Sequence, residues 1–575
     1  MLRIHRNPNV PYRPKAMKLQ VDREATRTWV YPTNKEHRDY QFNIVQRALF
    51  NNVLVALPTG LGKTFIAAVV ILNYYRWYPK GKIIFVAPTK PLVAQQQQAC
   101  HGICGLPWDQ AVELTGDTKA SLRGDEWKTK RIFYMTPQTF ENDLCSSAID
   151  TSDVICVVVD EAHRATGNYA YANVIRYLTA RNPFFRILAL TATPGSNTEK
   201  VQEVVDNLHI NSIEIRSEKA LDIRSYVHTK SEDPVVVPLG SVVSTLKEGM
   251  CTLMRGPLER LNKAGVVHQT DPASLHPFTI TSANADPRKR AVIYQQKLFH
   301  AMKEMRQMAE ALRYLTEHSV RMFSSRMLEL ETGVNSRGTK ASNKQTQAKM
   351  RSNTIIKNMT KVFEEAQDNS GRVSHPKMDY LKDVLLAHFS DLQEKGQETR
   401  AMVFCQYREC VNEIVEMLNE DRGEIRSTIF VGQAPDRNGG RGFTQKDQER
   451  VIKEFRKGQF NVLVATSIGE EGLDIGEVDL IVCYEAVKDS VRMLQRVGRT
   501  GRKRDGRIVV LMSEGVEERN WQKSKDSYKS IQHEITSGAS FELYDDVPRL
   551  VPDDIVSEVE FKEVDQPTFE PDLIR

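Results

Sequence analysis

The sequence predicts an α/β fold in which two domains with parallel sheets are separated by a helical segment. Short β-branched runs alternate with helical patterns between about residues 38 and 205, and the alternation resumes near residue 377. Between these regions, apolar residues recur at helical spacing instead. Alternating strands and helices are typical of a parallel sheet covered on both faces, and the intervening periodicity indicates amphipathic helices.

The strand-like runs fall into two groups of five. Those of the first region are 53–57, 82–87, 131–135, 154–159 and 186–190. Those of the second region are 401–405, 427–431, 462–465, 480–484 and 507–512. In the segment between them, the apolar stripe consists of Leu298, Met302, Met305, Met308, Leu312 and Leu315. This stripe predicts the core of a helical bundle rather than a binding groove.

These patterns divide the 575 residues into five parts. They are an N-terminal arm (1–30), a first α/β domain (31–205), a helical insert domain (206–374), a second α/β domain (375–530) and an acidic C-terminal tail (531–575). Residues 331–352 have almost no apolar content and are expected to form a mobile linker. The tail is expected to pack along the body or to stay loose.

The composition excludes several classes of protein. With 40% hydrophobic and 27% charged residues, the chain is not collagen-like, of low complexity or wholly disordered. The eight cysteines show no second pair at zinc spacing, so we expect reduced thiols. The longest apolar stretch, 65–72, is too short for a membrane span, and the N-terminus lacks the apolar core of a secretory signal.

A phosphate-binding loop is predicted directly after the first strand. Glycines let backbone N–H groups approach the phosphates, the lysine neutralises the β/γ oxygens, and the threonine hydroxyl binds Mg²⁺. A helix beginning after the loop adds its dipole. The residues of the loop are Leu57, Pro58, Thr59, Gly60, Leu61, Gly62, Lys63 and Thr64.

Two carboxylates follow the apolar run at 154–159. Ligands of open α/β sheets bind at the carboxyl ends of the strands, so this acidic pair is expected to face the phosphates. We expect Asp160 to hold Mg²⁺ and Glu161 to accept a proton from the attacking water.

Further motifs follow in order along the chain. The run Asp160-Glu161-Ala162-His163 resembles the DEAH box of superfamily 2 helicases. The other segments that resemble motifs of this superfamily are PTKP (88–91), TGD (115–117), TPQ (136–138), TATP (191–194), ATSIGEEGLDI (465–475) and QRVGRTGR (495–502).

Four further segments indicate one family within this superfamily. The segments RDYQ (38–41), DEAHRATGNYAY (160–171), HPKM (375–378) and GFTQKDQ (442–448) are similar to the Fanconi anaemia M / Hef-type DNA translocases, and most of all to their fungal members. The resemblance covers about residues 38–512. Members of this family often carry further domains beyond the motor, so the sequence is compatible with a fragment of a longer protein.

The resemblance implies two RecA-like parallel-sheet motor domains with a helical insert domain between them. It implies ATP and Mg²⁺ as ligands. Gln41 would contact the adenine, and Gly472 and Asp474 would touch the ribose side of the cleft.

The last of these motifs supplies positive charge for hydrolysis. Arg499 and Arg502 would act as arginine fingers on the γ-phosphate, and Gln495 would help to position the water. A third set of residues, His163, Thr191 and Thr193, would couple hydrolysis to movement.

Small, amide or basic residues near strand ends are expected to hold the nucleic-acid backbone. Such groups bond phosphate and sugar, which positions a strand without reading its sequence, as a translocase requires. The residues are Thr89, Lys90, Thr115, Gly116, Thr136, Gln406, Gly432 and Thr466.

The net charge of +5 conceals a sorted distribution. Residues 281–360 contain 15 Lys/Arg and 6 Asp/Glu, which gives +9, and residues 541–575 contain 3 Lys/Arg and 11 Asp/Glu, which gives −8. The basic insert therefore suggests a clamp on duplex or branched DNA, with a solvated charged face as the alternative.

Three functions remain open at this point. The first is an ATP-dependent 3′–5′ DNA helicase or translocase that tracks along one strand and remodels forks, D-loops or junctions in nuclear DNA repair, with repair proteins as partners. The second is an RNA-duplex-sensing or processing helicase with the same motor. The third, a nucleic-acid scaffold with a structural ATP switch, is disfavoured because the residues for hydrolysis are all present.

Overall fold

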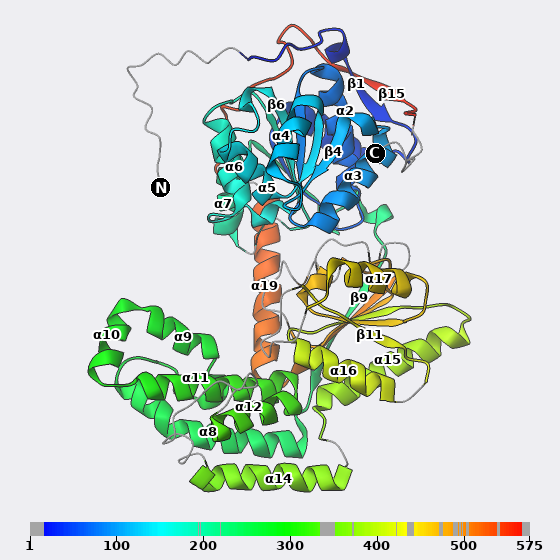
Figure 1. Cartoon of the computed structure of the whole chain (residues 1–575). Helices are drawn as coiled ribbons and strands as arrows, with labels where there is room; N and C mark the ends of the chain where they lie inside the picture. The colour runs from blue at the N-terminus through cyan, green and yellow to red at the C-terminus, as the bar shows by residue number, and fades with distance from the viewer. Residues whose placement is uncertain are drawn as a thin grey trace. The chain divides into compact units, whose positions relative to one another are not determined.

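The computed structural model describes residues 17–193, 195, 197–218, 220–333, 351–370, 373–420, 423–433, 442–470, 475–486, 493, 496, 498–501, 505–537 and 541–565. The chain divides into two compact units (Figure 1). Unit 1 comprises Met1–Val227 and Tyr528–Arg575, and unit 2 comprises His228–Ser527. None of the helices in the described part of the chain has both the length and the apolar character that crossing a membrane requires.

Unit 1 contains a seven-stranded parallel sheet with the order β4-β5-β3-β6-β7-β2-β8. Its strands are β2 (Val53–Ala56), β3 (Lys82–Val86), β4 (Ala111–Leu114), β5 (Ile132–Met135), β6 (Val154–Val159), β7 (Arg186–Thr191) and β8 (Ser212–Ile215). The helices of this unit are α1 (Asp39–Phe50), α2 (Lys63–Trp77), α3 (Lys90–Cys104), α4 (Ala120–Thr129), α5 (Pro137–Cys145), α6 (Ala170–Thr179) and α7 (Thr198–Leu208).

Helices cover both faces of this sheet. Alternate strand residues enter opposite cores. Val53 and Val55 belong to the core that includes residues of α1, α2 and α3, whereas Leu54 belongs to the core that includes residues of α4, α5, α6 and α7. The central strands are therefore mostly apolar, which is why each could be recognised in the sequence.

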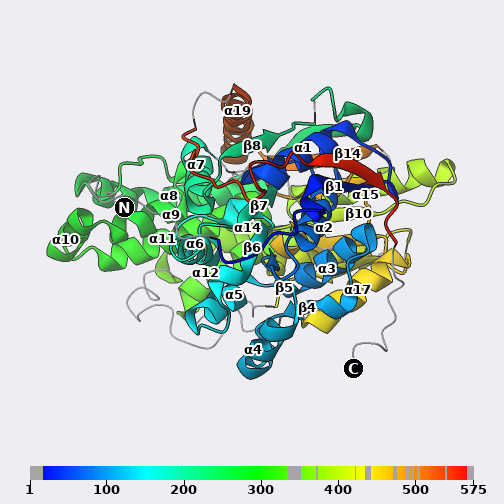
Figure 2. The same cartoon turned by 90° about the horizontal axis from the view of Figure 1, so that it is seen from above.

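The two ends of unit 1 pair with each other. Strand β1 (Thr28–Pro32) runs parallel to β15 (Glu558–Lys562), and both views show the two side by side (Figures 1 and 2). Residues 541–565 also dock on the body, because Leu550 enters the core and Arg186 donates to the Pro548 carbonyl at 3.1 Å. Residues 541–565 of the expected tail thus pack along unit 1. The expected arm over 1–30 already belongs to the body from residue 17, since Met17, Leu19 and Val21 pack against this core.

Unit 2 contains a six-stranded parallel sheet with the order β11-β12-β10-β13-β14-β9. Its strands are β9 (Lys230–Val237), β10 (Ala401–Phe404), β11 (Ser427–Phe430), β12 (Val462–Ala465), β13 (Leu480–Cys483) and β14 (Gly506–Ser513). Its flanking helices are α15 (Pro376–Glu394), α16 (Arg408–Glu420), α17 (Gln445–Arg456) and α19 (Val516–Ser537), the last of which continues into unit 1.

The helical insert also belongs to unit 2. It comprises α8 (Gly240–Lys263), α9 (Pro277–Ala285), α10 (Pro287–Gln295), α11 (Phe299–Arg313), the π-helical turn η7 (Tyr314–His318), α12 (Val320–Thr332) and α14 (Thr354–Ser370). The predicted methionine and leucine stripe is buried, and one continuous core runs from the insert into the second sheet. Most of the predicted linker at 331–352 lies outside the described residues.

The expected boundary at residue 206 is wrong. Strand β8 follows it yet pairs with β2 in the first sheet, and β9 pairs with β14 in the second sheet. Both are edge strands, so only one side of each takes part in the hydrogen-bonded ladder, and charged residues such as Glu214 and Asp233 interrupt the apolar pattern.

We predict that the C-terminal segment stabilises unit 1. Replacing Leu550, 5% exposed, with alanine should lower the free energy of unfolding by about 2–5 kcal/mol, because a buried leucine leaves a cavity when truncated. Denaturant unfolding of the whole chain measures this. Val556→Ala, at an 84% exposed position of the same segment, is the matched control and should change the free energy little. Equal effects of the two substitutions would contradict the docking of the tail.

Candidate nucleotide and nucleic-acid sites

The phosphate-binding loop lies between β2 and α2. Its backbone is left-handed at Gly60 (φ 88°) and at Gly62 (φ 79°), a conformation that favours glycine. A Cβ atom at Gly62 would also overlap the side-chain amide of Gln41. Conformation and close contact therefore both require glycine at residue 62.

Side chains from α1 and α2 fix this loop. The Gln41 amide donates to the Leu61 carbonyl at 3.1 Å, and the Tyr40 hydroxyl donates to the same oxygen at 2.9 Å. The Lys63 ammonium donates to the carbonyls of Leu57 at 2.7 Å and Pro58 at 3.3 Å. The structure thus brings Gln41, predicted to contact adenine, onto the phosphate loop itself.

The two predicted carboxylates follow β6 and differ in environment. Asp160 is buried and accepts hydrogen bonds from the Glu161 backbone N–H at 2.9 Å and from Gln96 at 3.1 Å. Burial, together with the charge of Glu161, raises the pKa of Asp160 to about 7. Glu161 has a positive φ of 49°, and within the described part of the chain its buried Oε2 atom accepts no hydrogen bond.

The oxygens predicted to hold Mg²⁺ meet at one side chain. Gln96, on α3, accepts from the Thr64 hydroxyl at 2.9 Å and donates to Asp160 at 3.1 Å. A hydroxyl and a carboxylate are hard oxygen ligands of the kind Mg²⁺ prefers, so the residues present fit this ion. Sequence reasoning missed Gln96, although a polar residue within the buried stripe of Leu92, Val93 and Cys100 was a detectable signal.

The predicted coupling residues also lie together. His163 Nδ1 is 3.1 Å from the Thr191 hydroxyl, which donates to the Thr193 carbonyl at 2.6 Å. His163 Nδ1 also lies 3.4 Å from Glu161 Oε2. A chain of contacts therefore connects the end of β6 with the end of β7.

The predicted sites divide the carboxyl edge of the first sheet into two halves. Residues proposed for nucleic-acid contact follow the neighbouring strands β4, β5 and β3, and residues proposed for the nucleotide or for coupling follow β6, β7 and β2. At the first half, the buried hydroxyl of Thr89 has no hydrogen-bond partner among the residues that the structure describes, and Thr136 shares a hydrogen bond with Thr139 at 2.8 Å. Lys90 pairs with Asp117. Thr115 and Gly116 follow β4 directly.

The second sheet repeats this arrangement. Gln406, Gly432 and Thr466 follow β10, β11 and β12, which are neighbours in the sheet. The Gly432 carbonyl accepts from Arg408 at 2.6 Å. Three predicted strand contacts therefore lie along one half of the carboxyl edge of unit 2.

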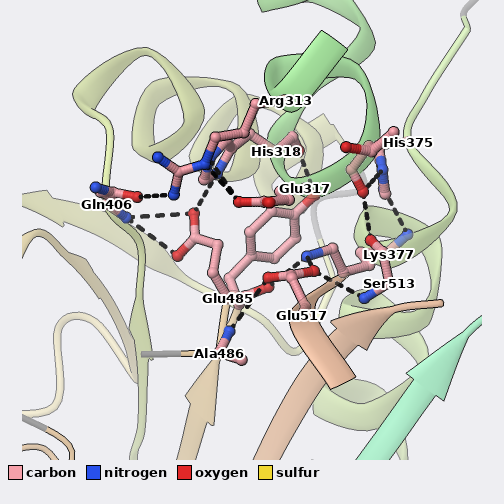
Figure 3. Close-up of polar contacts among 12 residues, drawn as sticks. Arg313, Glu317, His318, His375, Lys377, Gln406, Glu485, Ala486, Ser513 and Glu517 are labelled. Atoms are coloured by element: carbon pink, nitrogen blue, oxygen red, sulfur yellow. Dashed lines mark hydrogen bonds and ion pairs between the residues drawn. The ribbon is translucent and has the colours of Figure 1, made fainter. Parts of the chain in front are cut away.

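The exposed side chain of Gln406 lies at the edge of a polar network whose other members include the buried His318 and Glu485 (Figure 3). Arg313, at the end of α11, donates to the Gln406 side-chain oxygen at 3.0 Å. The Gln406 backbone N–H donates to Glu485 at 3.1 Å, and His318 lies 2.9 Å from the same carboxylate. Burial alone would raise the pKa of Glu485, but the hydrogen bond from His318 and nearby positive charges hold it below the usual value.

A buried ion pair completes this network. Lys377 lies 2.8 Å from Glu517 and donates to the Tyr484 carbonyl at 3.1 Å, and Glu517 accepts from the Ser513 backbone N–H at 2.7 Å (Figure 3). Both charged side chains are nearly inaccessible to water, so removing either would leave an uncompensated buried charge. The network attaches the insert to the carboxyl edge of the second sheet.

A group of possible metal ligands lies beside it. Cys405, Cys410 and Glu485 bring three ligand atoms within 4.8 Å of one another. Burial raises the pKa of both thiols, and both Glu485 oxygens accept hydrogen bonds from the Gln406 N–H. These groups are therefore satisfied as neutral thiols and a hydrogen-bonded carboxylate.

The last two motifs are described in part. Arg499 is 4% exposed within unit 2, and its backbone N–H donates to the Arg496 carbonyl at 3.1 Å. Because Arg499 belongs to unit 2 and the phosphate loop to unit 1, its role as an arginine finger stays a prediction. The remaining predicted residues of these motifs, Gly472, Asp474, Gln495 and Arg502, lie outside the described residues.

Two parallel sheets, a phosphate loop and a DEAH acidic pair define the motor architecture of superfamily 2 helicases. Two family models match accordingly: "Type III restriction enzyme, res subunit" over residues 34–196 and "Helicase conserved C-terminal domain" over residues 376–504.

Relatives and a solved structure narrow this class. The "ATP-dependent DNA helicase mph1" of Neurospora crassa is 44% identical over 95% of this chain and 47% of its own length. The corresponding protein of Pyricularia oryzae is also 44% identical, over 95% of this chain and 50% of its own length. The chain thus spans about half the length of these curated relatives. The crystal structure of the Pyrococcus furiosus Hef helicase domain matches with a TM-score of 0.63 and 32% identity, covering 85% of this chain and 98% of that domain. The chain belongs to the Hef-type family of superfamily 2 helicases.

We predict that His375 makes the free energy of unfolding decrease at acidic pH. Its Nδ1 atom accepts from the Lys377 backbone N–H at 3.1 Å and its Nε2 atom faces the Thr316 carbonyl at 3.3 Å, so the ring is neutral. Burial, followed by the Lys377 charge, lowers the pKa of His375 to about 3. Below the unfolded value of about 6.5 the unfolded chain gains a proton that the folded chain does not, so stability falls as the pH falls.

The measurement compares wild type with His375→Asn, which retains a capping acceptor but does not titrate. Between pH 7.5 and 5.0, wild type should lose about 2 kcal/mol more of its unfolding free energy than the variant. Urea unfolding of unit 2, followed at both pH values, tests this. Identical pH dependence of the two proteins would show that His375 does not carry the effect.

Proposed function

We propose that the chain is the motor of an ATP-dependent 3′–5′ DNA helicase or translocase that remodels branched DNA during repair in the nucleus. The proposal depends mainly on where the predicted residues lie along the carboxyl edges of the two parallel sheets. In both sheets the residues suited to the nucleic-acid backbone follow adjacent strands, and in the first sheet the nucleotide residues occupy the other half. The names of the two fungal relatives, both DNA helicases, favour DNA over an RNA duplex.

Hydrolysis is assigned to residues of the first sheet and of the last motif. Lys63 would neutralise phosphate oxygens, and Glu161, whose Oε2 atom accepts no hydrogen bond from the described residues, would act as the general base. Thr64 and Asp160 would hold Mg²⁺, which neutralises phosphate charge when it is bound. Arg499 and Arg502 would stabilise the charge that develops on the γ-phosphate.

Movement would follow from changes in the grip of the two domains. ATP binding closes the domains and hydrolysis opens them, while small polar groups hold the backbone of one strand without reading bases. The contacts from Glu161 through His163 to Thr191 provide a path from the nucleotide to the neighbouring strand end. This grip suits a motor that must move through any sequence.

The insert would hold the duplex beyond the tracked strand. Arg288 and Arg290 of α10 are exposed, within a segment that carries a charge of +9. Arg313 contacts Gln406 directly, so the insert and a proposed strand contact would respond together. Repair proteins are the proposed protein partners.

The choice between DNA and RNA can be measured directly. ATP turnover of the chain should rise strongly with a forked DNA and little with an RNA duplex of the same length. Greater stimulation by the RNA duplex would contradict the proposal and favour an RNA-processing motor. Repeating the assay at several salt concentrations separates backbone binding from other effects, since phosphate contacts weaken steeply with salt.

The site assignment predicts the behaviour of two substitutions. Lys63→Ala and Arg499→Ala should each reduce DNA-stimulated ATP hydrolysis by at least about 10³-fold, because each removes positive charge from the transition state. Turnover of radiolabelled ATP measures the loss, and an unchanged melting temperature shows that the variants fold. Lys128→Ala, an exposed lysine on α4, is the control and should retain activity. Wild-type turnover in either site variant would refute its assigned role.

A further inference from the structure

The side chain of Gln96 bridges the two groups assigned to the metal ion. It lies on α3, and the distances from its amide are 2.9 Å to the Thr64 hydroxyl and 3.1 Å to the Asp160 carboxylate. The three residues come from different parts of the fold, since Thr64 is the second residue of α2 and Asp160 follows β6. With 8% of its surface exposed, Gln96 is held in place by its surroundings.

Chemistry determines which way this amide points. A carboxylate can only accept hydrogen bonds, so the NH₂ group of Gln96 faces Asp160 and its carbonyl oxygen faces Thr64. The Thr64 hydroxyl must then donate its proton to Gln96. Both lone pairs of that hydroxyl oxygen consequently remain available to a cation, as metal ligation by a neutral hydroxyl requires.

We propose that Gln96 is a positioning residue for Mg²⁺ that orients the Thr64 hydroxyl and the Asp160 carboxylate and thereby sets the affinity of the nucleotide site for the metal. The proposal rests on the proposed function, in which these two groups take Mg²⁺. Gln96 itself does not touch the ion. Residues that orient metal ligands in this way usually contribute about 10–100-fold to metal affinity.

A purely structural role would have different consequences. If Gln96 only satisfied a buried carboxylate, its loss would lower thermal stability and weaken nucleotide binding to the same extent with and without metal. A positioning role predicts instead that the metal requirement changes while metal-free binding does not. Measuring binding in both conditions therefore separates the two roles.

The test uses the full chain and a fluorescent ATP analogue carrying a methylanthraniloyl group. Binding is followed while Mg²⁺ is titrated, and again in EDTA, for wild type, Gln96→Met and Gln96→Asn. Methionine fills the space without hydrogen bonding, and asparagine keeps the amide but is one methylene too short to reach both partners. Gln98→Met, an exposed position on the same helix, is the matched control.

Both Gln96 variants should need about 10–100-fold more Mg²⁺ for half-maximal binding, with affinity in EDTA and melting temperature close to wild type. The Gln98 variant should match wild type throughout. An unchanged Mg²⁺ requirement in both Gln96 variants, or an equal loss in EDTA, would overturn the role of Gln96 and leave the proposed function standing. A wild-type chain that binds the analogue no better with Mg²⁺ than in EDTA would overturn the proposed function itself.

Discussion

All strands of each large sheet run in the same direction, and this constraint organises the candidate sites. The loops that follow parallel strands all begin at the carboxyl edge of the sheet, so residues far apart in sequence lie close together there. The phosphate loop, the acidic pair and the Thr191–Thr193 turn come together in this way without any special connection between them. The helices on both faces bury strands such as β2, β6 and β7 completely.

The candidate nucleotide site contains a buried carboxylate, which is unfavourable unless other groups form hydrogen bonds with it. Asp160 keeps its place through bonds from a backbone N–H and from Gln96, both of which can donate to a carboxylate whether or not a cation is near. In unit 2, buried charges are compensated by an ion pair instead. Lys377 and Glu517 compensate each other deep in the structure, and the backbone groups around them take up the remaining hydrogen bonds. The hydrogen bonds around Asp160 are compatible with binding of a cation by its carboxylate, whereas the carboxylate of Glu517 is already paired with Lys377.

Ten strands, nine of them inside a sheet and one (β11) at an edge, and the phosphate site were predictable because their signals are local. A run such as Val154–Val159 is apolar at every position, and Gly60 and Gly62 mark a loop that other residues could not form. The strands β4, β8 and β9 were missed because edge strands carry charges, and β1 and β15 because they form a separate two-stranded pair. Gln96 and Arg313 were missed for another reason. Their roles come from partners on other elements, and a single sequence does not show which polar residue in a helix has such a partner.

The pairing of β1 with β15 also constrains how the protein is made. These strands lie more than 500 residues apart in the chain, and all of unit 2 is encoded between them. During synthesis, all residues of unit 2 have therefore been made before β15, the strand that pairs with β1 of unit 1. Unit 2 can fold before residues 558–562 are made, whereas the pairing of β1 with β15 in unit 1 must wait for them.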